Sequence, residues 1–188
     1  VLLVGAVMAM VPGLGTIAQA RELPADVRFD LNDYSVPHTY VRRTLTVLAD
    51  DGAVRCWGRG RAGQLGAGYP SERAMPVDVT GARGAVEVAV GALHSCARMN
   101  DGTVRCWGDN GVGQLGDGRA PQGSAEPVVV EGLDHVTRLD AAGNVTCALR
   151  EDGSAWCWGG SIQESPQGFM LGDGVVGVHP RPVAVRAE

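Results

Sequence analysis

Short stretches of alternating apolar and polar residues, separated by glycine and proline, run through most of the chain. Alternation of this kind predicts β-strands, and the glycines and prolines predict where they end. The predicted strands are residues 76–79, 85–90, 94–99, 103–107, 127–130, 136–141, 145–150 and 154–158. None of these stretches has the 3.6-residue stripe of a helix, and all are short for one. The pattern therefore predicts an all-β fold.

One phrase recurs within this pattern. The chain reads DGAVRCWG at 51–58, DGTVRCWG at 101–108 and DGSAWCWG at 152–159. A GQLG stretch follows the first two copies, and in the third copy an insertion that includes Phe169 and Met170 disrupts it. About four strands in each period of about 50 residues are typical of a β-propeller blade.

The recurring residues have structural interpretations. Aspartate followed by glycine is typical of a tight turn. Tryptophan at the same strand position in every copy favours packing between blades over a ligand platform. The glutamine, flanked by glycines, is interpreted as a loop anchor. The positions are Asp51, Gly52, Trp57, Gly58, Gln64 and Gly66, then Asp101, Gly102, Trp107, Gly108, Gln114 and Gly116, then Asp152, Gly153, Trp158 and Gly159.

The cysteine spacing predicts two disulfides. If residues 100–102 form a three-residue hairpin loop, Met99 faces Thr103, and Cys96 then lies opposite Cys106 at a non-hydrogen-bonded site. The Cα atoms at such a site are about 4.5 Å apart, within disulfide range. The same count around 152 pairs Cys147 with Cys157, whereas Cys56 faces Thr46 and stays unpaired. The alternative is that all five cysteines are buried thiols.

These motifs resemble the RCC1 repeat, named after the regulator of chromosome condensation. The resemblance lies in DGxVxCWGxxxxGQLGxG and in VEVAVGALHSCA at 86–97, and it extends over roughly 40–188. It implies four-stranded β-propeller blades, usually seven in a ring, that serve as a rigid protein-binding platform. Family members include a nucleotide-exchange factor for a small GTPase, chromatin binders and a secreted β-lactamase inhibitor. The cysteine-bearing form resembles bacterial exported members.

The number of predicted blades is too small for a ring. We count two full blades, 76–108 and 127–159, preceded by a half blade at about 40–58 and followed by a lone strand at 182–185. Residues 21–39 are then a linker or a degenerate first blade. Because propellers close with about four to eight blades, the chain is expected to be a fragment with blades missing, an open arc, or one part of an assembly.

Residues 1–20 carry no charge and end in the small-x-small triplet Ala18-Gln19-Ala20. This favours a secretory signal. A membrane anchor and a buried apolar segment are the alternatives. Export would also agree with paired cysteines, because disulfides persist in oxidising compartments.

Charge and motifs argue against several other functions. The formal net charge is −5, which disfavours nucleic acid as a partner. The glycine-rich stretches lack the lysine of a phosphate-binding loop, since the chain contains no lysine. The spacing of cysteine and histidine fits no metal site. The sequence predicts no cofactor, no nucleophile–base pair and hence no enzyme.

His94 stands where the repeat motif has a histidine. It could be a base or a ligand, but a structural hydrogen bond is favoured because Val145 takes the same position in the next copy.

The sequence therefore predicts a non-catalytic module, secreted or in the cell envelope, that binds a protein of unknown identity. The interface candidates are the loops 66–75, 117–126 and 160–170. The alternatives are a nucleotide-exchange factor for a small GTPase, and an enzyme whose catalytic groups lie elsewhere in a longer protein.

Overall fold

The computed structural model describes residues 44–48, 52–160 and 171–186. The predicted signal segment 1–20, the segment 21–39, Asp51 and loop residues 161–170 lie outside the described residues. The regular elements of the described part are all β-strands, as predicted. It has no helix long and apolar enough to cross a membrane.

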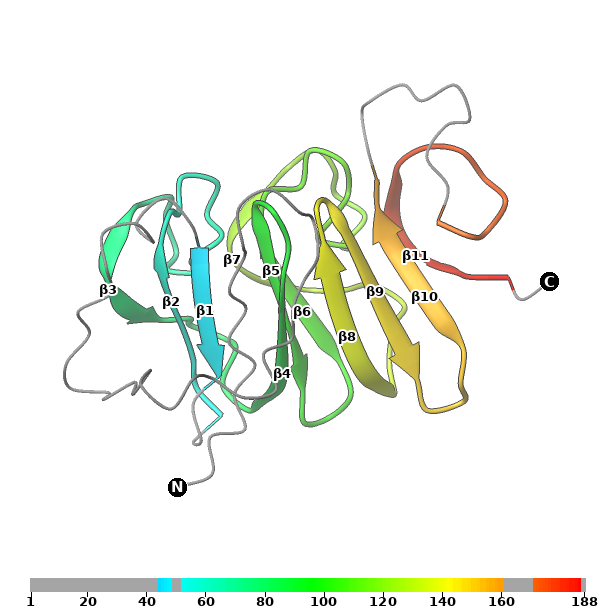
Figure 1. Cartoon of the computed structure of the whole chain (residues 1–188), viewed down its shortest axis with the longest axis horizontal. Coiled ribbons are helices and arrows are strands. Elements are labelled where there is room, and N and C mark those ends of the chain that lie inside the picture. The colour runs from blue at the N-terminus through cyan, green and yellow to red at the C-terminus, as the bar shows by residue number, and fades with distance from the viewer. Residues whose placement is uncertain (1–43, 49–51, 161–170, 187–188) are drawn as a thin grey trace, which may run out of the picture.

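The described strands form three antiparallel sheets that stand side by side (Figure 1). Within each sheet the strands follow chain order. The first sheet has β1 (Thr44–Leu48), β2 (Val54–Gly58) and β3 (Arg73–Asp78). The second has β4 (Ala85–Val90), β5 (His94–Met99), β6 (Val104–Gly108) and β7 (Ser124–Val129). The third has β8 (Val136–Ala142), β9 (Val145–Arg150), β10 (Ala155–Gly159) and β11 (His179–Ala184).

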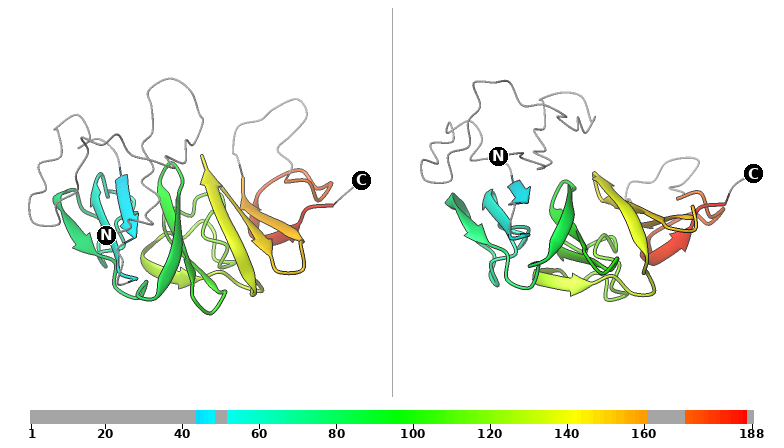
Figure 2. Two further views of the ribbon diagram at one scale, coloured as in Figure 1. Left: turned by 60° about the horizontal axis from the view of Figure 1, so that its bottom comes forward. Right: turned by 90° about the horizontal axis from the view of Figure 1, so that it is seen from below.

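The sheets follow one another along an arc, which is the arrangement of blades in a partial propeller (Figure 2). The leading strands β1, β4 and β8 contact one another in turn. Apolar cores fill the spaces between neighbouring sheets, one between the first and second and one between the second and third. The functional residues must therefore be sought at these junctions and in the loops between strands.

The sheets divide the chain differently from our prediction. We grouped the proline-led stretch 76–79 with the strands that follow it, but β3 pairs with the preceding β2. Likewise β7 pairs with β6, and β11, predicted as a lone strand, pairs with β10. The two four-stranded sheets are therefore 85–129 and 136–184, not 76–108 and 127–159. A long loop folds back to place the last strand of each sheet, so chain order alone did not reveal its partner.

Each last strand carries a proline at an irregularity in its pairing with the neighbouring strand. Pro76, Pro127 and Pro182 all fall within a shift of register opposite the tryptophan of the Trp-Gly pair. Proline has no N–H and is tolerated at sheet edges and bulges. β3 and β7 begin earlier than predicted, at Arg73 and Ser124, because the strand resumes on the other side of this bulge.

Candidate functional site

The hairpin between β5 and β6 has the predicted register. The amide of Met99 donates to the carbonyl of Thr103, and Cys96 lies opposite Cys106. These two cysteines form a disulfide with a Cα–Cα distance of 4.1 Å. Gly102 closes the turn with φ of 79°, the left-handed conformation that glycine adopts most easily. A short turn and a two-residue side-chain period thus bring the sulfur atoms together.

The next hairpin repeats this geometry, and the first lacks the cross-link. Cys147 lies opposite Cys157 and bonds to it, again with Cα atoms 4.1 Å apart. In the first sheet Cys56 lies opposite Thr46, whose Oγ1 is 3.0 Å from the sulfur. Burial raises the pKa of the Cys56 thiol to about 12. A thiol held in its neutral form is a poor nucleophile, so Cys56 is unsuited to covalent catalysis.

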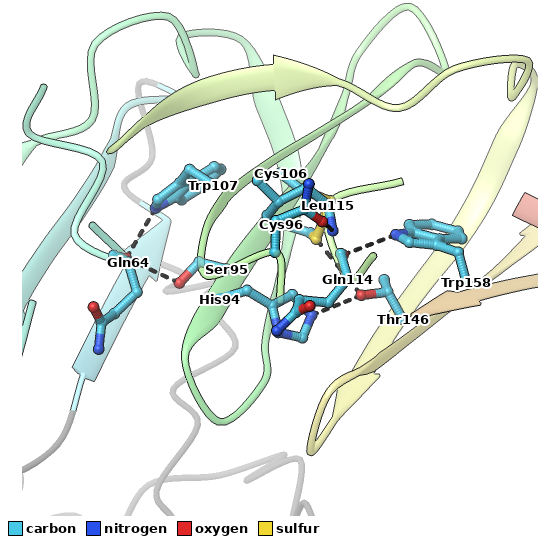
Figure 3. Close-up of a disulfide and its surroundings, with 11 residues drawn as sticks. Gln64, His94, Ser95, Cys96, Cys106, Trp107, Gln114, Leu115, Thr146 and Trp158 are labelled. Atoms are coloured by element: carbon cyan, nitrogen blue, oxygen red, sulfur yellow. Dashed lines mark hydrogen bonds between the residues drawn. A yellow bond between two sulfur atoms is a disulfide. The ribbon is translucent and has the colours of Figure 1, made fainter. Parts of the chain in front are cut away.

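Two of the three recurring tryptophans, Trp107 and Trp158, join neighbouring sheets (Figure 3). The indole Nε1 of Trp107 in β6 donates to the carbonyl of Gln64, 2.9 Å away in the loop after β2. Trp158 in β10 donates in the same way to the carbonyl of Gln114, at 3.0 Å. Both rings are buried. Trp107 and Trp158 therefore each occupy a junction, where a ligand could not reach the ring. Trp57, the first copy, is buried as well.

The GQLG loops are shaped to admit these rings. A Cβ atom added at Gly116 would lie 2.9 Å from Trp158 Nε1, and one at Gly66 would lie 3.0 Å from Trp107 Nε1. The side chain of Gln114 accepts from the amide of Val112 and donates to a carboxylate oxygen of Asp109, both at 2.9 Å. Glutamine therefore holds the loop closed from within, and glycine lets the next sheet approach.

His94 lies in the junction between the second and third sheets. Its Nε2 is 2.7 Å from Thr146 Oγ1 of β9, while its Nδ1 is buried without a hydrogen-bond partner (Figure 3). A Cβ atom at Gly91 would lie 2.1 Å from the ring, so glycine is required there. Burial lowers the pKa of His94 to about 4. The neutral, enclosed ring fits a structural contact between sheets.

The turn aspartates bind their own turns. Asp101 Oδ1 accepts from the amide of Thr103 at 2.9 Å and from its hydroxyl at 2.7 Å. Asp152 accepts from the amide of Ser154 at 2.9 Å and from its hydroxyl at 2.5 Å. These hydrogen bonds lower the pKa of both exposed carboxyls. Asp51 lies outside the described residues. In residues 52–160 and 171–186, no three acidic, histidine or cysteine side chains form a metal-binding group.

Sequence reasoning missed two buried polar residues in the second loop. Asn110 donates from Nδ2 to Asp117 Oδ1 and to the carbonyl of Gln122, both at 3.0 Å, and accepts from the amide of Leu115. Asn110 and Asp117 are both buried. The first loop has Gly60 and Ala67 at these positions, so the repeat pattern itself gave no signal. The position of Asp117 is taken in the third sheet by Asp173. Its carboxylate lies 3.6 Å from His179 Nδ1.

The candidate interface loops have an anchored base and an exposed tip. At the base, the amide of Gly68 donates to the carbonyl of Ala125 in the next sheet, and Gly118 donates likewise to Pro180. Beyond these bonds the chain is exposed at Tyr69, which is 51% accessible. The last residues of the first two predicted loops lie in strands instead, since β3 begins at Arg73 and β7 at Ser124. Of loop 160–170, only Gly160 is described.

Comparison with known families identifies the repeat. A model of the "Regulator of chromosome condensation (RCC1) repeat" matches residues 51–98 and 101–149, and a second model with that description matches 85–114. The chain belongs to the RCC1 repeat family. A model of the Mu transposase C-terminal domain also matches residues 22–62, largely outside the described part. No curated protein sequence matches the chain.

Solved RCC1-type structures share the fold. Human WBSCR16 is 22% identical with a TM-score of 0.64, covering 76% of this chain and 35% of its own. Yeast RCC1 (Prp20) bound to Kap60 is 22% identical with a TM-score of 0.60, covering 76% and 35%. Prp20p from Saccharomyces cerevisiae is 26% identical with a TM-score of 0.59, covering 80% and 37%. This RCC1-type chain thus spans little more than a third of each of these proteins.

Proposed function

We propose that this RCC1-type chain is a non-catalytic protein-binding module whose contacts come from the tips of the loops after β2 and β6. The observation that carries the proposal is the division of each loop into a fixed base and an exposed tip. Because the base is hydrogen-bonded to the next sheet, a partner can bind without the cost of ordering it. The tips differ in chemistry, with Tyr69 and Glu72 on one and Arg119 and Gln122 on the other.

Export to the cell surface or envelope is part of the proposal. Two disulfides and an uncharged N-terminal segment support it. Structural disulfides persist in oxidising compartments and are rare in the cytosol. A test is to express the chain with its N-terminal segment in the source organism and to measure its free thiols. One free thiol per chain in an extracytoplasmic fraction is expected, whereas five free thiols in the cytosol would contradict export.

Site-specific photo-crosslinking tests the binding surface. A photoreactive residue replaces Tyr69 or Arg119, and the protein is irradiated with the extracellular fraction of the source organism. We expect both positions to capture the same protein. Glu151, exposed in the turn at the opposite end of the sheets, is the matched control and should capture none. Equal capture from Glu151, or different proteins from the two loops, would contradict the proposal.

Regulation of a small GTPase is the second candidate function. The support is the similarity to Prp20p, whose structure is described together with its binding to Gsp1p and histones. The test is release of a fluorescent guanine nucleotide from a panel of purified GTPases. Accelerated release from any of them would favour this function. Unchanged release across the panel would leave the exported binding module as the better proposal.

A further inference from the structure

The two junctions between sheets differ in a buried histidine. We call the contact between the first and second sheets the first junction, and that between the second and third sheets the second junction. His94 of β5 lies in the second junction, where its Nε2 is 2.7 Å from Thr146 Oγ1 of β9 (Figure 3). Ser95, the next residue of β5, faces the first junction instead and donates to the carbonyl of Gln64 at 3.2 Å. Among the described residues, the first junction therefore has a hydroxyl where the second has an imidazole.

The site of His94 suits the neutral ring and not the cation. Its Nδ1 is buried without a hydrogen-bond partner. The backbone of Gly91 closes this side of the ring, because a Cβ atom added there would lie 2.4 Å from Nδ1. A proton added at Nδ1 would place a charged N–H where the described structure provides no acceptor. Burial of a charged group without a partner is costly.

The elements around the ring provide no charge that would offset this proton. Thr146 is uncharged, and so is Cys96, whose Sγ lies 3.8 Å from the Thr146 hydroxyl but is bonded in a disulfide. The turns between β4 and β5 and between β8 and β9 contain no charged side chain. The first carboxylate after β6 is that of Asp109, and it accepts from Gln114 Nε2 at 2.9 Å. Burial is accordingly the cause that lowers the pKa of His94 to about 4.

The second junction also holds the base of one candidate interface loop. The amide of Gly118, in the loop after β6, donates to the carbonyl of Pro180 in the third sheet at 2.9 Å. The amide of Ala92, next to the glycine that closes the histidine site, donates to the carbonyl of Gly143 in the third sheet at 2.8 Å. The loop after β2 is anchored across the first junction instead, through the amide of Gly68. Loosening of the second junction would therefore affect only one of the two loops.

We propose that the second junction is an acid-sensitive joint, in which a proton taken up from solvent by Nδ1 of His94 loosens the third sheet from the second and releases the base of the loop after β6. The first junction stays closed. Because the pKa is about 4 for the buried ring and 6.5 for the exposed ring, states that expose His94 gain about 20-fold in population between pH 7 and pH 5. For partner binding, which rests on the function proposed above, acid weakens the contacts of Arg119 and leaves those of Tyr69.

Residue-resolved hydrogen exchange tests the joint without any partner, so its result does not depend on whether the loop tips bind one. The intact, oxidised chain is measured at pH 7 and pH 5, and the rates are corrected for intrinsic exchange. We expect the protection of the Ala92 and Gly118 amides to fall about 20-fold. The Gly68 amide, which crosses the first junction, is the internal control and should lose less than about threefold. An equal fall at all three amides would mean unfolding of the whole chain and would overturn the joint, as would unchanged protection of Ala92 and Gly118.

Two variants separate the titration of His94 from its contact with Thr146. His94→Gln has no titratable ring, so Ala92 and Gly118 should follow Gly68 at both pH values, although the other buried histidine, His179, is still present. Thr146→Val removes the hydrogen bond but keeps the histidine. It should lower protection by the same factor at pH 7 and pH 5, so that the 20-fold ratio between them remains. A ratio that persists in His94→Gln would refute the proposal, and if this variant does not fold, the comparison of amides within the wild type still decides.

Discussion

The two junctions between sheets share one set of packing contacts and differ in the other contacts that surround it. At both, a tryptophan donates to a glutamine carbonyl and a loop glycine lies against the ring. The second junction adds the Cys96–Cys106 disulfide and the hydrogen bond between His94 and Thr146. At the first, Ser95 Oγ donates to the carbonyl of Gln64 at 3.2 Å. The tryptophan and the loop glycine are thus common to both junctions, whereas the disulfide and the histidine belong to one of them.

Removing the tryptophan should have the largest effect, and a similar one at both junctions. Trp107→Ala and Trp158→Ala each leave a cavity and remove a hydrogen bond to a glutamine carbonyl, so each should lower the free energy of unfolding by about 3–5 kcal/mol. Trp156→Ala, at a half-buried ring on β10, is the control and should cost clearly less. Denaturant titration measures all three. Unequal losses for Trp107→Ala and Trp158→Ala would show that the junctions are not equivalent.

Lowering the pH should destabilise the second junction, because His94 is buried there in its neutral form. The pKa of His94 falls from 6.5 to about 4 on folding because burial disfavours the cation. The unfolded chain then binds more protons between these pH values, so stability is complete above pH 6.5 and declines as the pH falls to 4. The expected loss is about 3 kcal/mol.

The variant His94→Gln separates this effect from the titration of carboxyls. Its loss of stability between pH 6.5 and 4 should be about 3 kcal/mol smaller than that of the wild type. Denaturant titrations at closely spaced pH values provide the measurement. Parallel stability curves for wild type and variant would show that the histidine is not buried in the folded chain.

The hairpins were predictable from the sequence because their geometry is local. A three-residue turn and the side-chain period of two determine that Cys96 faces Cys106 and that Thr46 faces Cys56. The partner of β3 was not predictable in this way, because Val77 meets Cys56 only after a long loop folds back. The role of Thr146 was hidden as well, since its contact with His94 spans two sheets. Contacts across junctions depend on how whole sheets stack, which residue spacing does not specify.

A disulfide can be added to the first hairpin, where Cys56 has no cysteine partner. Thr46→Cys places a second cysteine opposite Cys56 in the register that joins Cys96 to Cys106. The new bond should raise the free energy of unfolding by about 2–3 kcal/mol under oxidising conditions. Peptide mass analysis should find the introduced cysteine bonded to Cys56, and Thr46→Ser should give no such gain. If both of these thiols stayed free under oxidising conditions, the first hairpin would not have this register.

The smallest expected effect distinguishes a covered turn from an open one. Gly102→Ala and Gly153→Ala place the same side chain at nearly the same positive φ, so each should lose about 1 kcal/mol from backbone strain. Only at Gly102 does the new Cβ atom also press against the next sheet, at His135. Gly102→Ala should therefore be the more destabilising, by roughly 0.5–1 kcal/mol. Because the strain cancels in this difference, an equal loss at both positions would mean that the third sheet does not pack against the turn at Gly102.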